Sequence, residues 1–260
     1  MRILFIGDVV GRPGREAIRR WVPELSREFS VDFVIVNGEN SAGGVGATRD
    51  TIREIFSAGV HAITMGNHTW RKRELVGEID SLGPVVRPAN YPEGTPGKGA
   101  HCVALADGRK VGVVSVLGRV YMEPFACPFE AAKREVKALR RETNLIVVDA
   151  HAEATSEKAA LGWTLDGTCT AVVGTHTHVQ TADEQILPKG TAFITDVGMT
   201  GPKHSAIGVD FVPVIQKFTT GIPAPFTVSK NPPFLNGVMI EADESDGTAI
   251  RIERVVRKGA

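Results

Sequence analysis

Side chains that bind metal ions or transfer protons recur along the chain, each shortly after a run of apolar residues. These residues are Asp8, Glu39, Asn40, Asn67, His68, His151, His176 and His178. Carboxylate, amide and imidazole groups without a thiolate suit Mn²⁺, Fe²⁺ or Zn²⁺. The pattern predicts metal-dependent chemistry, provided that the fold brings these side chains together.

The pair His176 and His178 is the sharpest of these signals. The sequence His-Thr-His directly after an apolar run places two imidazoles near one point. Taken alone, Asp8 or Glu39-Asn40 would be assigned to turns or caps, and His151 to an ordinary structural histidine. All of them together, each at the end of an apolar run, favour a metal site.

Short apolar runs alternate with longer amphipathic stretches, which is typical of βαβ units with a mainly parallel sheet covered by helices. The expected strands are 2–7, 32–36, 61–65, 111–116, 145–149 and 170–173. The expected helices are 14–29, 48–58, 70–80, 129–141 and 211–218. The candidate residues follow the carboxyl ends of five of these strands, and such ends converge on one ligand-binding crevice.

Two hairpins and one long loop complete the expected fold. Asp107-Gly108 predicts a hairpin with a type I′ turn. A second hairpin is expected between 238–241 and 249–253. The Pro- and Gly-rich segment 84–99 is predicted to be a loop, either a plain surface loop or a lid over a binding site.

Composition limits the function classes. The 260 residues fit a single domain, 1–260, and the formal net charge of zero argues against an extended nucleic-acid surface or binding to an anionic membrane. The three cysteines are widely spaced and form no C-x-x-C pair. With an N-terminal apolar run too short for a signal peptide or a membrane span, this indicates a cytoplasmic protein.

The motifs resemble those of a known family. Gly7-Asp8, Gly38-Glu39-Asn40, Gly66-Asn67-His68, His151 and Gly174-Thr175-His176-Thr177-His178 are similar to the blocks of the calcineurin-like metallophosphoesterase superfamily. Three longer segments resemble its YmdB-like branch: 66–70, 87–92 and 196–202. The resemblance covers nearly the whole chain. It implies an α/β fold, namely a four-layer α/β/β/α sandwich with mixed sheets.

The chain departs from the wider superfamily at the first metal. Val10 stands where a histidine is usual, and Glu39 stands where an aspartate is usual. Asn40 lies beside Glu39, and its carbonyl oxygen can bind a cation in place of the missing histidine. The resemblance then implies two sets of ligands that share a bridging Glu39. Metal one has Asp8, Glu39, Asn40 and His178, and metal two has Glu39, Asn67, His151 and His176.

The implied chemistry is hydrolysis of a phosphodiester by a metal-bridging hydroxide. Two divalent ions would bring four positive charges, and a hydroxide with the carboxylates of Asp8 and Glu39 would bring three negative ones. The remainder of about one positive charge suits a phosphodiester monoanion. His68 is the expected catalytic residue and protonates the departing oxygen or binds the phosphoryl group. Thr69 follows it where many relatives have an acid, so its orienting partner must come from elsewhere. Iron or manganese is the favoured metal, with zinc as the alternative.

The resemblance implies a hydrolase acting on 2′,3′-cyclic nucleotides such as 2′,3′-cyclic AMP. Two other functions remain open. The same site could serve a nucleotide sensor or signalling scaffold with slow turnover. Gly7, Gly11 and Gly14 could instead form the loop of a dinucleotide-binding oxidoreductase, although Asp8 would repel a pyrophosphate and the histidines would be unexplained. The hairpins and the 84–99 loop are compatible with a homo-oligomer.

Overall fold

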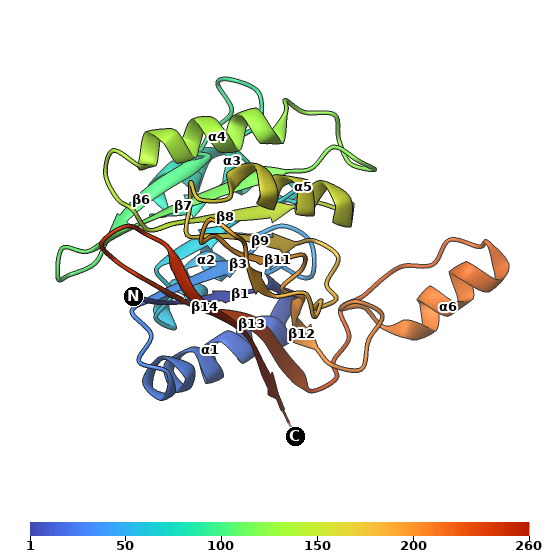
Figure 1. Ribbon diagram of the computed structural model, residues 1–260. Helices are drawn as coiled ribbons and strands as arrows, with labels where there is room; N and C mark the ends of the chain where they lie inside the picture. Colours follow the sequence, from blue (N-terminus) through green and yellow to red (C-terminus); the bar gives the residue numbers. More distant parts are fainter. Residues whose placement is uncertain (260) are drawn as a thin grey trace.

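Two β-sheets pack face to face, and helices cover the outer face of each (Figure 1). The computed structural model describes residues 1–259. The four-layer α/β/β/α sandwich implied by the resemblance is confirmed, and both sheets are mixed. The expectation of a single domain, 1–260, stays a prediction.

The first sheet has eight strands in the order β2-β12-β13-β1-β3-β4-β5, with β14 paired to β13. Its strands are β1 Arg2–Ile6, β2 Asp8–Val9, β3 Phe33–Asn37, β4 Ala62–Thr64, β5 Val85–Val86, β12 Met199–Pro202, β13 Pro233–Ala242 and β14 Ala249–Lys258. Neighbours from β1 to β5 run parallel, whereas β13 pairs antiparallel with β1, β12 and β14. The expected C-terminal hairpin is therefore confirmed, with strands longer than predicted.

The second sheet has six strands in the order β10-β11-β9-β8-β7-β6. Its strands are β6 Ala100–Ala104, β7 Lys110–Leu117, β8 Ile146–His151, β9 Ala171–Thr175, β10 Gln185–Ile186 and β11 Ala192–Ile194. The β6–β7 hairpin forms as expected, but its type I′ turn does not. Only Gly108 has a positive φ, of 89°, and Asp107 does not, because the loop is longer than two residues.

The helices are α1 Gly11–Glu28, α2 Arg49–Ser57, α3 Glu74–Glu78, α4 Pro128–Leu139, α5 Thr155–Leu165 and α6 Phe211–Thr220, with a 3₁₀ turn at Ile79–Ser81. The helix expected at 70–80 is wrong in its first part. Residues 66–71 instead form tight turns, in which Thr69 N–H donates to Gly66 and Arg71 N–H donates to His68. Helix α5 was not among the expected helices.

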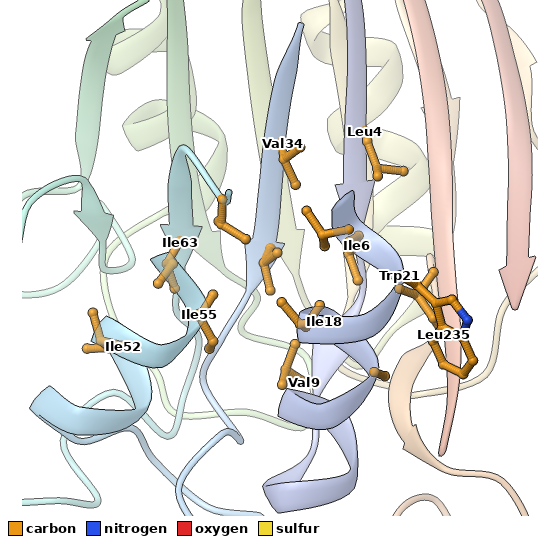
Figure 2. Close-up of a cluster of buried hydrophobic side chains, with 14 of the residues drawn as sticks. Leu4, Ile6, Val9, Ile18, Trp21, Val34, Ile52, Ile55, Ile63 and Leu235 are labelled. Atoms are coloured by element: carbon orange, nitrogen blue, oxygen red, sulfur yellow. The ribbon is translucent and has the colours of Figure 1, made fainter. Parts of the chain in front are cut away.

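Three apolar layers hold the sandwich together. Alternate residues of β1 point to opposite faces. Ile3 and Phe5 enter the cluster between the sheets, while Leu4 and Ile6 pack under α1 and α2 (Figure 2). A third cluster lies between the second sheet and helices α4 and α5. Packing on both faces fixes the strand registers, and these registers place the polar strand ends.

Helix α6 stands apart from the sandwich at the end of an extended excursion (Figure 1). None of its residues is buried. Within residues 1–259, no helix combines the length and apolar character needed to cross a bilayer.

Candidate metal centre

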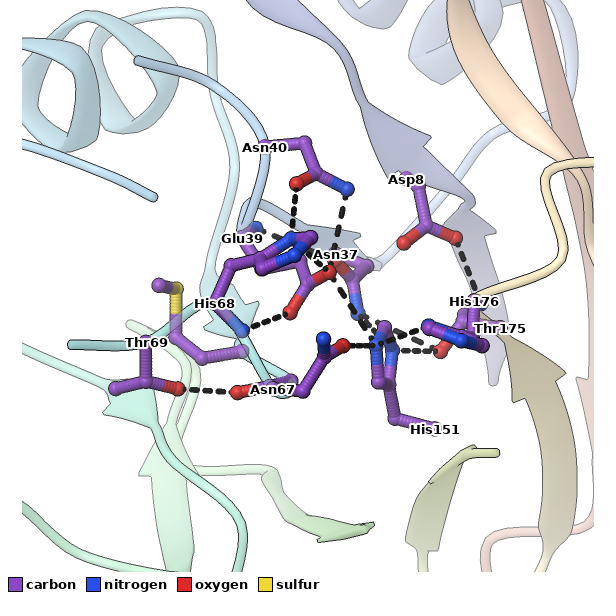
Figure 3. Close-up of polar contacts among 12 residues, drawn as sticks. Asp8, Asn37, Glu39, Asn40, Asn67, His68, Thr69, His151, Thr175 and His176 are labelled. Carbon is purple, nitrogen blue, oxygen red and sulfur yellow. Dashed lines mark hydrogen bonds and ion pairs between the residues drawn. The ribbon is translucent and has the colours of Figure 1, made fainter. Parts of the chain in front are cut away.

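The carboxyl ends of the parallel strands meet between the two sheets, as the sequence predicts. β1, β3 and β4 come from the first sheet, and β8 and β9 come from the second. The eight predicted site residues lie at or just beyond these ends, and Figure 3 shows seven of them turned toward one centre. His151 is the last residue of β8 rather than part of the following loop.

His151 Nε2 lies at the middle of one half of the site. Asn67 Oδ1 is 3.0 Å away, His176 Nδ1 is 3.2 Å away and Glu39 Oε1 is 3.3 Å away. Glu39, His151 and His176 each offer a ligand atom within 4.8 Å of the others. These residues could hold a divalent cation, because their lone pairs face one another across a short gap.

The other half of the site contains Asp8, Asn40 and His178. Asp8 is completely buried. Its Oδ2 accepts from His176 N–H at 3.1 Å, but its Oδ1 has no hydrogen-bond partner among residues 1–259. His178 Nε2 lies 3.8 Å from that oxygen, while His178 Nδ1 lies 2.9 Å from the carbonyl oxygen of Ile207. A buried carboxylate oxygen without a donor is costly, and a cation would satisfy it.

The amide nitrogen of Asn40 points into the site. The nitrogen lies 3.2 Å from Glu39 Oε1 and 3.3 Å from His178 Nε2. The carbonyl oxygen instead lies 2.7 Å from His68 Nδ1. A half turn about the terminal torsion would exchange the two atoms, and Asn40 could then offer oxygen to a cation.

Charges at the centre shift one another's pKa values. Burial raises the pKa of Asp8 to about 6. Burial also acts to raise the pKa of Glu39, but His151 and His68 outweigh it and hold that pKa well below its usual range. Burial lowers the pKa of His151, yet Glu39, Asp8 and Asp149 overcome this and raise it to about 9. The site therefore favours positive charge at its middle.

The pKa of the neighbouring His176 moves the other way. Burial and the charge of His151 lower it to about 3. Because His151 takes the positive charge, His176 stays neutral, which is the form that binds a metal ion.

The loop that carries His176 and His178 is strained. Both residues have positive φ angles, of 96° and 66°, which are uncommon for residues other than glycine. Asp196 holds the loop by accepting hydrogen bonds from Thr177 N–H at 3.1 Å and Thr177 Oγ1 at 2.7 Å. Lys158, fully buried on α5, donates to Asp196 at 2.7 Å. Strain of this kind persists only where surrounding contacts enforce it.

His68 lies beside the centre and is partly exposed. Its backbone N–H donates to Glu39 Oε2 at 3.0 Å, and its Nδ1 lies 2.7 Å from Asn40 Oδ1. Glu39 Oε1 lies 3.1 Å from the same nitrogen. Asn40 and Glu39 are thus the orienting partners that the sequence left unidentified. With Nδ1 engaged, Nε2 is the ring atom left to interact with a substrate.

Two glycines are explained by close approach of other atoms. A Cβ on Gly66 would lie 2.2 Å from His151 Nε2 and 2.4 Å from Glu39 Oε2, so a side chain there would block the site. A Cβ on Gly7 would lie 1.8 Å from the carbonyl oxygen of Gly198. Strand packing therefore accounts for Gly7 without a dinucleotide.

Sequence reasoning missed the polar residues behind the ligands. Asp149 and Thr175 are buried beside His151, Asn37 precedes Glu39, and Lys158 supports the histidine loop through Asp196. A signal was available for one of them. Asp149 interrupts the apolar strand Ile-Val-Val-Asp-Ala-His, whereas the burial of Lys158 on α5 is visible only in the structure. Charged residues are almost never fully buried unless they are paired.

Comparisons with known proteins agree on one family. The model of the YmdB-like protein family matches residues 4–255. The chain is 50% identical to a 2′,3′-cyclic-nucleotide 2′-phosphodiesterase of Bacillus subtilis (strain 168), over 98% of this chain and 97% of that protein.

Two solved structures are similar over almost their whole length. A hypothetical protein from Thermus thermophilus aligns with a TM-score of 0.93 and 41% identity, covering 100% of both chains. A structure described as a novel phosphatase from Mycoplasma pneumoniae aligns with a TM-score of 0.92 and 36% identity, covering 99% of this chain and 93% of that one.

Proposed function

Because this chain belongs to the YmdB-like protein family, we propose that it hydrolyses 2′,3′-cyclic nucleotides, such as 2′,3′-cyclic AMP, at a dinuclear metal centre. It is a hydrolytic phosphoesterase, as its relatives are named. One observation supports the metal centre most strongly. Asn67 Oδ1, His176 Nδ1 and Glu39 Oε1 lie 3.0–3.3 Å from His151 Nε2.

The proposed ligands form two sets that share Glu39. Asp8, Asn40 and His178 hold metal one with Glu39, and Asn67, His151 and His176 hold metal two with Glu39. The unpartnered oxygen of Asp8 and the contacts of His151 support this division. The nitrogen and oxygen donors suit iron or manganese, with zinc as the alternative. When bound, such a pair activates water and stabilises charge on the phosphate.

His68 is the proposed proton donor. Hydrolysis of the cyclic phosphate forms a bond between phosphorus and a water oxygen and breaks a bond to ribose O2′, which needs a proton. When Asn40 turns its oxygen toward metal one, its amide N–H faces His68 Nδ1 and donates to it, so the ring proton lies on Nε2 for that transfer. The net charge of zero favours a small substrate over a long nucleic acid.

The test pairs metal content with activity in wild type and Asp8→Asn. Elemental analysis and hydrolysis of 2′,3′-cyclic AMP and bis-p-nitrophenyl phosphate would be measured on the same samples. In Asp8→Asn we expect loss of metal and a fall in activity of at least about 10²-fold. The metal-free variant should be more stable than metal-free wild type by about 1–3 kcal/mol, because a buried carboxylate oxygen without a donor has gone.

Asp166→Asn is the matched control. Asp166 is also buried, but it precedes β9 and accepts backbone hydrogen bonds from Lys189 and Thr191 away from the site. It should keep both metal and activity. A wild type that binds no metal, or an Asp8→Asn protein with full activity, would contradict the proposal. Binding of the nucleotide with metal but without turnover would point to a sensor instead.

A further inference from the structure

A buried carboxylate lies behind His151, on the side away from the centre. Asp149 precedes His151 by two residues on β8, so the two side chains lie on the same face of the strand. Asp149 is completely buried. It accepts hydrogen bonds from Thr64 Oγ1 at 2.5 Å, Thr175 Oγ1 at 2.6 Å and Asn37 Nδ2 at 3.0 Å. Every partner is a neutral side chain, and none is a cation.

The hydroxyl of Thr175 links this carboxylate to His151. Its oxygen lies 2.6 Å from Asp149 Oδ1 and 2.8 Å from His151 Nδ1. Thr175 Oγ1 donates its single proton to Asp149 Oδ1. The lone pairs of the hydroxyl are then left for His151, and His151 Nδ1 must carry the proton of that contact.

The contact with Thr175 therefore leaves Nε2 of His151 as the nitrogen that faces the centre without a fixed proton. Nδ1–H is bonded to Thr175, and Nε2 is the atom surrounded by Asn67, His176 and Glu39.

We propose that Asp149 is a positioning residue that acts through Thr175 to fix the His151 proton on Nδ1, and thereby presents Nε2 to metal two. This inference rests on the proposed function. Histidine ligands commonly donate their second N–H directly to a carboxylate or a carbonyl. Here a threonine hydroxyl stands between the histidine and the carboxylate.

The same carboxylate also supports Glu39 across the two sheets. Asn37 and Thr64 belong to β3 and β4 of the first sheet, whereas Asp149 and Thr175 belong to β8 and β9 of the second. Asn37 donates to Asp149 through Nδ2, and its Oδ1 accepts from Glu39 N–H at 3.2 Å. One buried group thus fixes a ligand from each sheet.

Mn²⁺ titration of the full-length, chelator-treated protein by calorimetry tests the proposal. Thr175→Val keeps the shape of the side chain and removes the hydroxyl, and we expect Mn²⁺ to bind about 10–100-fold more weakly. Thr175→Ser restores a hydroxyl and should restore the affinity. Asp149→Asn removes the charge and should weaken binding to a similar extent. It also carries the test if Thr175→Val does not fold.

Thr170→Val is the matched structural control. Thr170 is also fully buried and directly precedes the same strand at its other end, where its hydroxyl accepts from Ile146 N–H at 3.0 Å. This variant should lose stability, as Thr175→Val does, but keep Mn²⁺ affinity. Equal weakening in Thr170→Val would overturn the proposal, because general destabilisation would then explain the result.

The outcomes separate the two levels of inference. If wild type takes up none of Mn²⁺, Fe²⁺ and Zn²⁺, the proposed function fails and the role of Asp149 fails with it. If wild type binds Mn²⁺ and folded Thr175→Val binds it equally well, the positioning role alone is overturned.

Discussion

Two regions of the molecule reverse the usual placement of side chains. One is the buried polar network behind the site, and the other is segment 211–226, here called the α6 arm. Asp149, Thr175 and Lys158 are polar and completely buried. Phe211, Phe218 and other large apolar residues of the arm are exposed, with Phe218 at 81%. The arm carries one charged residue, Lys217.

The difference lies in what each region gains from its contacts. In the buried network, each polar side chain has hydrogen-bond partners within the fold, which offset the cost of removing it from water. In the arm, no residue of α6 is buried, and the helix stands apart from the sandwich (Figure 1). The stability of the fold should therefore depend strongly on the network and weakly on the arm.

The largest effect is expected from Lys158→Met. Removing the ammonium leaves Asp196 as an uncompensated buried charge, which should lower the free energy of unfolding by about 3–5 kcal/mol. Chemical denaturation measures this directly. Lys133→Met, on the exposed side of α4, serves as the control and should change the free energy by less than about 0.5 kcal/mol. Equal stability of the two variants would break the comparison.

The pH dependence of the metal-free protein should give the next largest effect. The pKa of His151 is raised to about 9, above the ordinary value of 6.5. The folded state thus holds the proton more tightly, and this stabilisation is full below pH 6.5 and lost as the pH rises through about 9. Unfolding free energy should fall across that window by an amount on the order of 3 kcal/mol.

Two variants sharpen this prediction. His151→Gln should flatten the dependence between pH 6.5 and 9, because the titrating group is absent. His101→Gln, a half-buried histidine on β6, should leave it in place, since burial lowers its pKa rather than raising it. Denaturant titrations at a series of pH values would decide. A slope unchanged by His151→Gln would assign the effect to another group.

The smallest effect is expected in the arm. Phe218→Ser should change the free energy of unfolding by less than about 0.5 kcal/mol, because this ring is already mostly in water. By contrast, Phe33→Ala, at a fully buried ring on β3, should cost about 3–5 kcal/mol. Thermal unfolding of both variants compares them. A large loss in Phe218→Ser would show that the arm supports the fold.

Much of the architecture could be predicted from local pattern. Apolar runs located six of the strands, such as β3 and β8, and helical periodicity located α1, α2 and α4 to within a few residues. Short elements escaped, as did α5. Its apolar and polar residues do not separate cleanly into two faces. The start of the predicted helix at 70–80 failed because tight turns around His68 override the helical preference of the segment.

The sequence by itself determined which residue types end each strand. It also determined that these ends meet at one edge of the sheet, because the alternation of strand and helix makes the strands parallel. It could not determine the partners behind them. The contacts of Asp149 with Asn37 and Thr64 join strands of different sheets, and they depend on how the sheets stack. Hydrogen bonds require positions accurate to a fraction of an ångström. Such accuracy comes from packing across the whole molecule, so only the tertiary structure decided which nitrogen of His151 faces the centre.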